Sequence, residues 1–318
     1  MIHFSIYNCC FITKGFSRGC LIDVERNLHC SVPLELCNIL DNKQISEKSD
    51  FFEHIEFLRN EGFLYFTDPN EVDSYSHNEI FTPFVFNNLI FDVSNIDDFF
   101  SRIQKINSNE IETIQIRFYF KLNIQQIYSV LCYLVERDFY SIELLFNHDE
   151  NNSTEEYLKI YNSYEYITKL VVFNYMSDIY PKIKNIFFVQ QELESENQCG
   201  KISENLFCPN LRTFLSAKTA NSCLYKKISI DKKGYIKNCP SMNKSYGNID
   251  DNITLKEALS IPDFTKLWHI TKDQIEVCKD CEFRYICTDC RCFITDKNNI
   301  LSKPKNCKYN PYSTEWEE

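Results

Sequence analysis

Glycine, methionine and long apolar runs are all scarce in this sequence. Only 6 glycines and 3 methionines occur among 318 residues, and no glycine-rich phosphate loop is present. The chain is therefore not expected to be a nucleotide-using ligase, because such enzymes cradle phosphates with the backbone amides of these loops. The 6 histidines do not form the H-E-x-x-H pattern of zinc proteases. No apolar run approaches the ~18 residues of a membrane-spanning helix, so no membrane partner is expected.

Acidic residues outnumber basic ones, 45 to 34, and the formal net charge is −11. Nucleic acids and anionic membranes are bound through basic surfaces, so we expect neither as a partner. The start of the chain is apolar but has no basic n-region and no small-residue cleavage site, which predicts a cytoplasmic protein. Thiols stay reduced in the cytosol. The 16 cysteines are therefore more naturally metal ligands than disulfides.

Four regions follow one another along the chain. We predict a small winged-helix-like unit over residues 1–69, a linker over 70–84, a series of βα units over 85–204 and a cysteine-rich domain over 205–318. The first unit is expected to hold three strands and about three helices, with a helix beginning at Pro33.

The βα series alternates apolar strand patterns with amphipathic helices. Repeated βα units with short connections predict an α/β fold with a parallel sheet, either open or part of a barrel. One predicted strand, residues 113–120, has a polar face that includes Arg117. If that face lines a cavity, Arg117 is a candidate for binding an anionic ligand; an exposed edge strand would explain the same pattern.

Ten of the cysteines fall between Cys199 and Cys307, whereas the earlier ones are scattered. The scattered group, which includes Cys9 and Cys10, is interpreted as small buried hydrophobic residues. In the C-terminal region, two CxxC pairs begin at Cys278 and Cys287. Two such pairs are typical of structural zinc, but only five residues separate them, against the ~15–20 of zinc ribbons. Iron–sulfur clusters take thiolates in fours, and this region supplies enough for two [4Fe–4S] clusters.

The spacing of these cysteines resembles the SPASM domain, which carries auxiliary clusters in many radical S-adenosylmethionine (SAM) enzymes that modify peptides. Cys223, Gly234 and Cys239 match the first half of its pattern, including a predicted β-hairpin. The second half departs from the pattern at Cys290, which stands one residue early, whereas Cys292 stands one residue late. The resemblance implies two ligand sets. Cys278, Cys281, Cys287 and Cys307 would hold one cluster, and Cys223, Cys239 and Cys290 the other. Cys208 is our choice for an upstream fourth ligand, with Cys199 in reserve; a cluster with three protein ligands or none stays open, as does Cys292 in place of Cys290.

Over its whole length the chain is similar to the SPASM-domain peptide maturases of grasp-with-spasm systems. These are encoded beside an ATP-grasp ligase and a small precursor peptide, and the resemblance implies a role in maturing a ribosomally made peptide. It also implies that the first unit is a PqqD-like leader-recognition domain, which captures a peptide as an added strand beside a helix. The peptide-binding residues expected here are Leu28, His29, Cys30, Ser31 and Val32 on the strand, and Phe51, Ile55 and Leu58 on the helix.

The CxxxCxxC motif of radical SAM enzymes is absent from the chain. Without the three cysteines that leave one iron open to S-adenosylmethionine, this cofactor is not expected, and the middle region is interpreted as a reduced, partial (β/α) barrel. The residues favour recognition and scaffolding over catalysis. Two alternatives stay open: a redox-active peptide-modifying enzyme that uses its clusters, and a zinc-stabilised peptide-binding module.

Overall fold

The computed structural model describes residues 1–68, 82–177 and 183–317, and the predicted linker lies almost entirely outside these ranges. The chain forms two compact units. Unit 1 consists of Met1–Phe81, Gly200–Cys223 and His269–Glu318, and unit 2 of Thr82–Cys199 and Leu224–Trp268. Each unit therefore joins segments that are far apart in the sequence. The division at residues 69, 85 and 205 stays a sequence-based prediction.

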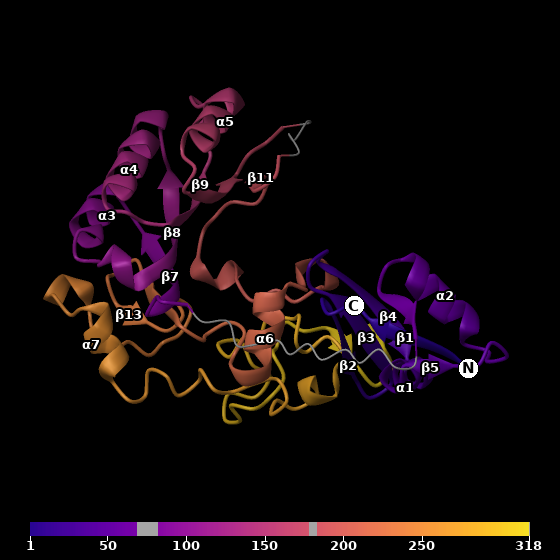
Figure 1. Cartoon of the computed structure of the whole chain (residues 1–318). Helices are drawn as coiled ribbons and strands as arrows, with labels where there is room; N and C mark the ends of the chain where they lie inside the picture. Colours follow the sequence, from indigo (N-terminus) through magenta and orange to yellow (C-terminus); the bar gives the residue numbers. More distant parts are fainter. Residues whose placement is uncertain (69–81, 178–182, 318) are drawn as a thin grey trace. The chain divides into compact units, whose positions relative to one another are not determined.

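The N-terminal part of unit 1 contains two small antiparallel sheets and two helices (Figure 1). The first sheet has the order β2-β3-β4 and the second the order β5-β1-β6. The elements are β1 (Ile2–Ile6), β2 (Cys10–Lys14), β3 (Arg18–Asp23), β4 (Leu28–Pro33), α1 (Leu34–Asn42), β5 (Gln44–Ile45), α2 (Phe52–Asn60) and β6 (Leu64–Thr67). The expectation of three strands and about three helices was wrong here, since the described residues of this part form β1 to β6 and two helices. A turn separates β1 from β2, and in it the amide of Cys10 donates to the Tyr7 carbonyl.

One apolar core joins these sheets and helices. It is built from residues that include Phe4, Leu21, Leu36, Ile55 and Leu58, all almost fully buried. The helix α2 buries Ile55 and Leu58 because they lie three positions apart, on one helical face. This face of α2 is therefore turned into the core.

The C-terminal part of unit 1 has little regular structure. Its elements are the 3-10 helix η3 (Glu204–Leu206), α6 (Leu211–Thr219), the 3-10 helix η5 (Cys278–Asp280), β14 (Tyr309–Asn310) and β15 (Glu315–Trp316). Phe214 of α6 and Phe283 pack with Cys20 and Ile22 of β3 in a second apolar cluster. Through this cluster the cysteine-rich segments of unit 1 pack against the β2-β3-β4 sheet of the same unit.

Unit 2 is built on a seven-stranded sheet in the order β11-β10-β9-β8-β7-β12-β13. All neighbours are parallel except β12 and β13. The elements are β7 (Phe86–Val93), α3 (Ile96–Ile103), the 3-10 helix η1 (Ser108–Glu110), β8 (Ile111–Lys121), α4 (Ile124–Glu136), β9 (Ser141–Asn147), α5 (Thr154–Ser163), β10 (Ile167–Phe173), β11 (Ile186–Phe188), the 3-10 helix η2 (Glu196–Gln198), β12 (Lys227–Ile230), β13 (Ile236–Lys237), the 3-10 helix η4 (Ile249–Asp251) and α7 (Leu255–Ser260). The predicted α/β class and the predicted parallel sheet are confirmed.

The strands β7 to β11 stand in sequential order, each beside the one before it in the chain. Crossovers between neighbouring parallel strands are almost always right-handed, which puts successive helices on one side of the sheet. Figure 1 shows α3, α4 and α5 along one side. The chain then returns past β7 and adds β12 on its other side, so the sequential order holds for β7 to β11 only. Only one face of the sheet is covered by these helices, which explains why β8 carries polar residues on the other.

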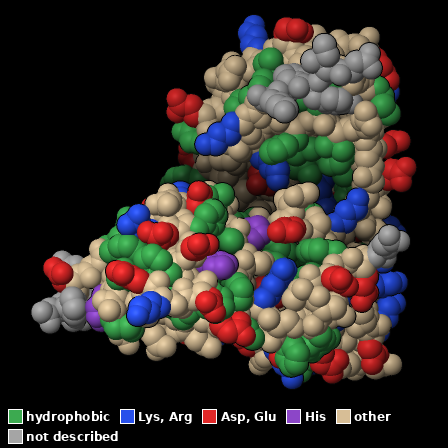
Figure 2. All heavy atoms as spheres, turned by 90° about the vertical axis from the view of Figure 1, so that its right-hand side faces the viewer, with side chains coloured by type: hydrophobic (Ala, Val, Ile, Leu, Met, Phe, Trp, Pro, Cys, Tyr) green, Lys and Arg blue, Asp and Glu red, His purple; other side chains and the backbone are tan. Residues whose placement is uncertain are grey.

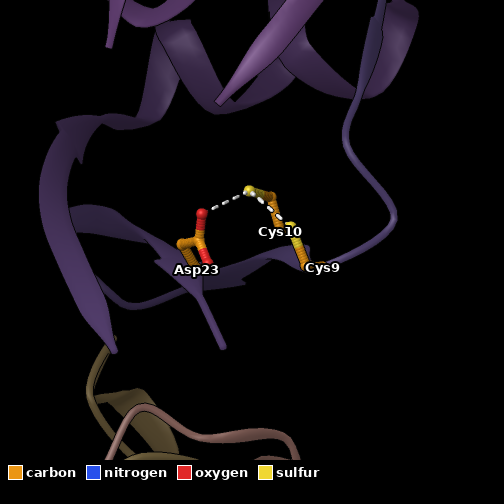
Figure 3. A group of neighbouring side chains, drawn as sticks. All are labelled: Cys9, Cys10 and Asp23. Carbon is orange, nitrogen blue, oxygen red and sulfur yellow. Dashed lines mark hydrogen bonds between the residues drawn. The ribbon is translucent and has the colours of Figure 1, made fainter. Parts of the chain in front are cut away.

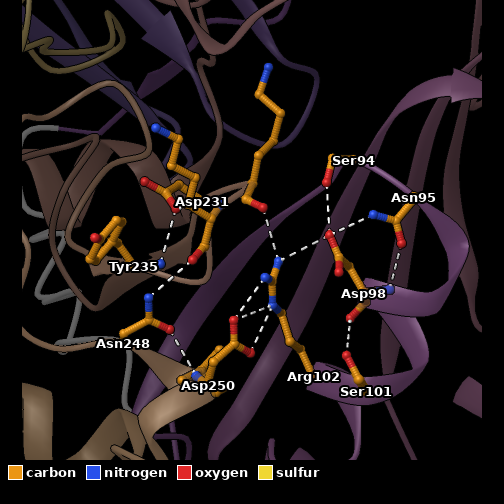
Figure 4. A network of polar contacts seen from close by, with 12 residues as sticks. Ser94, Asn95, Asp98, Ser101, Arg102, Asp231, Tyr235, Asn248 and Asp250 are labelled. Carbon is orange, nitrogen blue, oxygen red and sulfur yellow. Dashed lines mark hydrogen bonds and ion pairs between the residues drawn. The ribbon is translucent and has the colours of Figure 1, made fainter.

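The predicted hairpin is observed as β12 and β13, but it continues the parallel sheet, with β12 beside β7. Gly234 lies in its turn with φ +82°, and a Cβ there would lie 2.6 Å from the Asn248 Oδ1 atom. Arg102 of α3 donates to the Asp250 carboxylate and to the Lys232 carbonyl, which ties the hairpin to α3 (Figure 4). The glycine of the cysteine pattern is therefore required by the backbone of this turn.

Candidate metal centre

Four cysteines gather around one small cavity in unit 1. Cys278, Cys281, Cys287 and Cys307 all line it, together with Lys272 and Tyr309. The turn of η5 brings the first two together, since the amide of Cys281 donates to the Cys278 carbonyl at 3.0 Å. Cys307 is remote in sequence. An isolated parallel β-bridge between Cys307 and Ile202 holds it in position. The structure thus collects the four residues of the first expected ligand set.

Burial sets the chemistry of these thiols. It raises the pKa of Cys278 to about 12 and raises the pKa of Cys281 and Cys287 above the ordinary value for a thiol. At neutral pH, without a cation, these three side chains are therefore protonated. A metal centre that binds them must displace the protons, so its affinity increases with pH.

Lys272 is a buried cation beside these sulfurs, and sequence reasoning missed it. Only 5% of the residue is exposed. Burial lowers the pKa of its ammonium, but the negative charges of Cys287 and Cys278 in their thiolate form and of Asp289 outweigh that effect, and the pKa is raised. The positive charge of Lys272 therefore lies next to sulfurs that would be negative as thiolates. A lone lysine before the first CxxC gives no sequence signal of this, because its burial depends on packing of remote segments.

The spacing of the four sulfurs can be compared with what each candidate group needs. Tetrahedral zinc places its thiolate sulfurs about 3.8 Å apart, given a Zn–S bond of about 2.3 Å. Among the residues that the structure describes, no three of these four sulfurs lie within 4.8 Å of one another. The free space among them is about 20 Å³, so the side chains would have to open to admit four irons. Four thiolates are the donor set both of an iron–sulfur cluster and of a structural zinc ion.

The second expected ligand set is divided between the units. Cys223, Cys290 and Cys208 belong to unit 1, and Cys239 to unit 2. Within unit 1, the hydroxyl of Ser222 donates to the Cys287 carbonyl and accepts from the amide of Asp289, so Cys223 follows a residue fixed to the CxxC segment. These four ligands, and the reserve Cys199, which is exposed in unit 2, stay predictions.

Cys290 and Cys292 differ in their surroundings. Cys290 is 8% exposed and its sulfur accepts a hydrogen bond from the amide of Phe293, whereas Cys292 is partly exposed. Gly200 packs against Cys290, because a Cβ on that glycine would lie 3.4 Å from the Cys290 sulfur. Between the two cysteines, Arg291 donates to the buried Asp289. Arg291 is therefore a structural residue of this segment.

The strand expected to receive a peptide is β4. Among the described strands it pairs with β3 alone, so its other edge is unpaired there. Leu28 and Ser31 are exposed, His29 and Cys30 are partly exposed, and Val32 is buried. The ring of His29 also contacts Phe207 and Phe283. This edge has the unsatisfied backbone groups that strand addition uses.

The helix residues expected beside the peptide are placed differently. Phe51 is partly buried at the start of α2, and Ile55 and Leu58 are 0% and 2% exposed. Both of the latter pack in the first core of unit 1, which leaves them no surface for contacting a peptide. Their assignment as peptide contacts is corrected accordingly: they stabilise the fold.

Arg117 lies on β8, which is a central strand, so the edge-strand explanation of its polar face was wrong. It is 7% exposed and pairs with the buried Asp92. Asp92 lines a cavity of about 470 Å³ in unit 2, along with Glu196, Asp231 and Lys232. Asp92 already neutralises the guanidinium of Arg117, so Arg117 is not free to bind an anion. It stabilises Asp92, which lines the cavity.

A G-x-S-x-G pattern, the hallmark of a hydrolase elbow, occurs at residues 15–19. It forms the turn between the antiparallel strands β2 and β3, and no helix follows it there. The Ser17 hydroxyl donates to the Tyr312 carbonyl at 2.8 Å. The strand-to-helix context of a nucleophile is missing, so the pattern has no catalytic meaning here.

Figure 2 shows acidic and basic side chains interspersed over the face it presents. No helix in the described part of the chain is both long enough and apolar enough to span a membrane.

Comparisons with known proteins are sparse. No family's sequence profile matches the chain, and no curated protein matches it. Among solved structures, Streptococcus suis SuiB bound to S-adenosylmethionine is 13% identical with a TM-score of 0.34, and the alignment covers 94% of this chain and 98% of that one. SuiB bound to its precursor peptide SuiA is 12% identical with a TM-score of 0.31, covering 95% and 98%. At such scores nothing about the activity of this chain follows from the likeness.

Proposed function

We propose that this chain is a cluster-bearing, peptide-binding component of a system that matures a ribosomally made peptide, working with an ATP-grasp ligase in the cytoplasm. The observation that carries the proposal is the gathering of Cys278, Cys281, Cys287 and Cys307 around one cavity with the buried cation of Lys272. The resemblance of the cysteine pattern to SPASM domains supplies the biological setting.

In this proposal, the four thiolates hold one [4Fe–4S] cluster, and a second is held by Cys223, Cys239, Cys290 and Cys208. When bound, a cluster supplies either a cross-link that stabilises this loop-rich region or a one-electron carrier. Lys272 offsets part of the negative charge of a thiolate-ligated cluster. The protein's own residues thus provide binding and charge balance, and no residue here is assigned a catalytic role.

The test is iron and sulfide analysis of the full chain purified without oxygen. Two clusters give about eight irons and eight sulfides per chain, and Cys278→Ala is expected to remove about half of both. Cys132→Ala is the matched control, because Cys132 is exposed and lies outside the C-terminal cysteines. Stoichiometric zinc without iron would contradict the cluster and leave the zinc-stabilised peptide-binding module.

Peptide capture is proposed at the open edge of β4. A precursor strand that adds there would protect the outward amides of residues 28–32 from hydrogen exchange. The strand β6 is a suitable control, since it is also an edge strand of unit 1. Protection of β4 but not β6, on adding the precursor peptide encoded beside the gene, is expected. Equal exchange with and without the peptide would exclude this edge as the binding surface.

A further inference from the structure

Three potential metal ligands meet at the open end of the β2–β3 hairpin, away from the four cysteines described above. They are the sulfurs of Cys9 and Cys10 and a carboxylate oxygen of Asp23, and all lie within 4.8 Å of one another (Figure 3). Cys10 and Asp23 are directly opposite each other in the antiparallel register. The interpretation of Cys9 and Cys10 as mere core residues overlooked this, although pairing across the hairpin turn could have located it.

The distances among these atoms match the edges of a zinc tetrahedron. The two sulfurs are 3.9 Å apart, and the Cys10 sulfur is 3.6 Å from the Asp23 Oδ2 atom. Bonds of about 2.3 Å to sulfur and about 2.0 Å to oxygen at tetrahedral angles give edges of about 3.8 Å and about 3.5 Å. A single ion can therefore contact all three atoms with little movement.

The Asp23 carboxylate is held in place by other groups. Its Oδ1 atom accepts hydrogen bonds from the amides of Glu25 and Arg26, at 3.0 and 2.8 Å. The Nε atom of Arg26 donates to Oδ2 at 2.6 Å, and the same guanidinium is fixed by the carbonyls of Glu61 and Gly62. Such outer partners orient a ligating carboxylate and are typical of protein metal sites.

Charge and access also suit a divalent cation. Two thiolates and one carboxylate carry three negative charges, which one divalent cation and Arg26 neutralise together. Asp23 and Cys10 are 1% and 8% exposed, whereas Cys9 is partly exposed, which gives the ion a path from solvent. Burial raises the pKa of both thiols. Binding therefore releases two protons to solvent, with no change of oxidation state.

We propose that Cys9, Cys10 and Asp23 form a three-ligand site for a thiophilic divalent cation of the zinc class, with the fourth position taken by water on the side of Cys9. The site shares no residue with the proposed cluster ligands. A test of this site is therefore independent of any test of the proposed function.

The first experiment measures zinc bound by the full chain, purified with its iron content intact and titrated with zinc chloride against a chelator. Cys9→Ser and Asp23→Asn are expected to lose one zinc per chain, or to bind it at least ~10–100-fold more weakly, the loss typical of removing even an outer partner. Cys132→Ser is expected to match the wild type. Unchanged zinc binding in both site variants, at equal iron, would overturn the proposal.

A second measurement needs no variant and so does not depend on whether the variants fold. Alkylation of Cys9 by iodoacetamide is followed by mass spectrometry with and without zinc chloride. Zinc is expected to slow the modification of Cys9 by more than tenfold while leaving that of the exposed Cys132 unchanged, since only a metal-bound thiolate is shielded. Equal rates at Cys9 with and without zinc would show that no such site exists.

Discussion

Arg117 donates two hydrogen bonds to Asp92, from Nε at 2.6 Å and from Nη2 at 2.9 Å, on the face of the unit 2 sheet opposite α3, α4 and α5. The two residues stand opposite each other on the neighbouring strands β8 and β7. Both are nearly inaccessible to solvent. Two buried charges in this geometry satisfy each other, and neither tolerates the loss of its partner.

Replacing Arg117 by methionine is expected to destabilise the protein by ~3–5 kcal/mol, because the Asp92 carboxylate is left buried without a counter-charge. The free energy of unfolding is measured by urea titration followed by circular dichroism. The double variant Arg117→Met/Asp92→Leu is the control, and it is expected to recover much of the loss since no charge remains buried. Equal stability of Arg117→Met and the wild type would contradict the pairing.

Gly234→Ala is expected to destabilise unit 2 by ~1–3 kcal/mol, the range for a residue forced into a sparsely populated backbone region. Its φ is +82°, and the new Cβ would meet the side chains of Asn248 and Asp250 at 2.6 and 2.8 Å. Gly62→Ala is the comparison, with φ +73° but only the flexible end of Arg26 nearby, at 3.4 Å. A larger decrease in the urea midpoint for Gly234→Ala than for Gly62→Ala would show that the Cβ clash adds to the backbone strain. Equal decreases would show that the backbone strain alone accounts for the loss of stability.

Because of His148, we expect the free energy of unfolding to decrease in mild acid. Burial lowers its pKa below the ordinary value of 6.5, and its Nδ1 atom lies 3.0 Å from the Tyr157 hydroxyl. The unfolded chain therefore takes up a proton first as the pH falls. This contribution is fully present above pH ~6.5 and declines below it. The urea midpoint of His148→Gln is expected to fall less steeply than that of the wild type between about pH 7 and pH 5, and parallel curves would refute it.

Lys272→Met is expected to move the reduction potential of the proposed cluster to more negative values by tens of millivolts, because a buried positive charge favours the reduced, more negative state. The potential is measured by a redox titration of the full chain without oxygen. Lys279→Met is the matched control, since Lys279 is adjacent to Cys278 in sequence but exposed. A shift as large in Lys279→Met as in Lys272→Met would mean that burial beside the sulfurs has no special effect.

The sequence by itself determined the local elements of unit 2. The strand expected at 113–120 and the alternation of helix and strand expected after it were found as β8, α4 and β9. Their hydrophobic periods are properties of short segments, so they can be read without knowing the fold. The spacing of Cys278, Cys281 and Cys287 likewise predicts that these residues lie close together, and all three line one cavity.

Only the tertiary structure decided which distant residues meet. It placed β12 beside β7, Asp92 against Arg117, Lys272 among the cysteines and Asp23 opposite Cys10. It also turned Ile55 and Leu58 into a core instead of a peptide groove. Periodicity shows that a helix has an apolar face but not what covers that face. Strand order, burial and the pairing of charges depend on contacts between remote segments, which no local pattern contains.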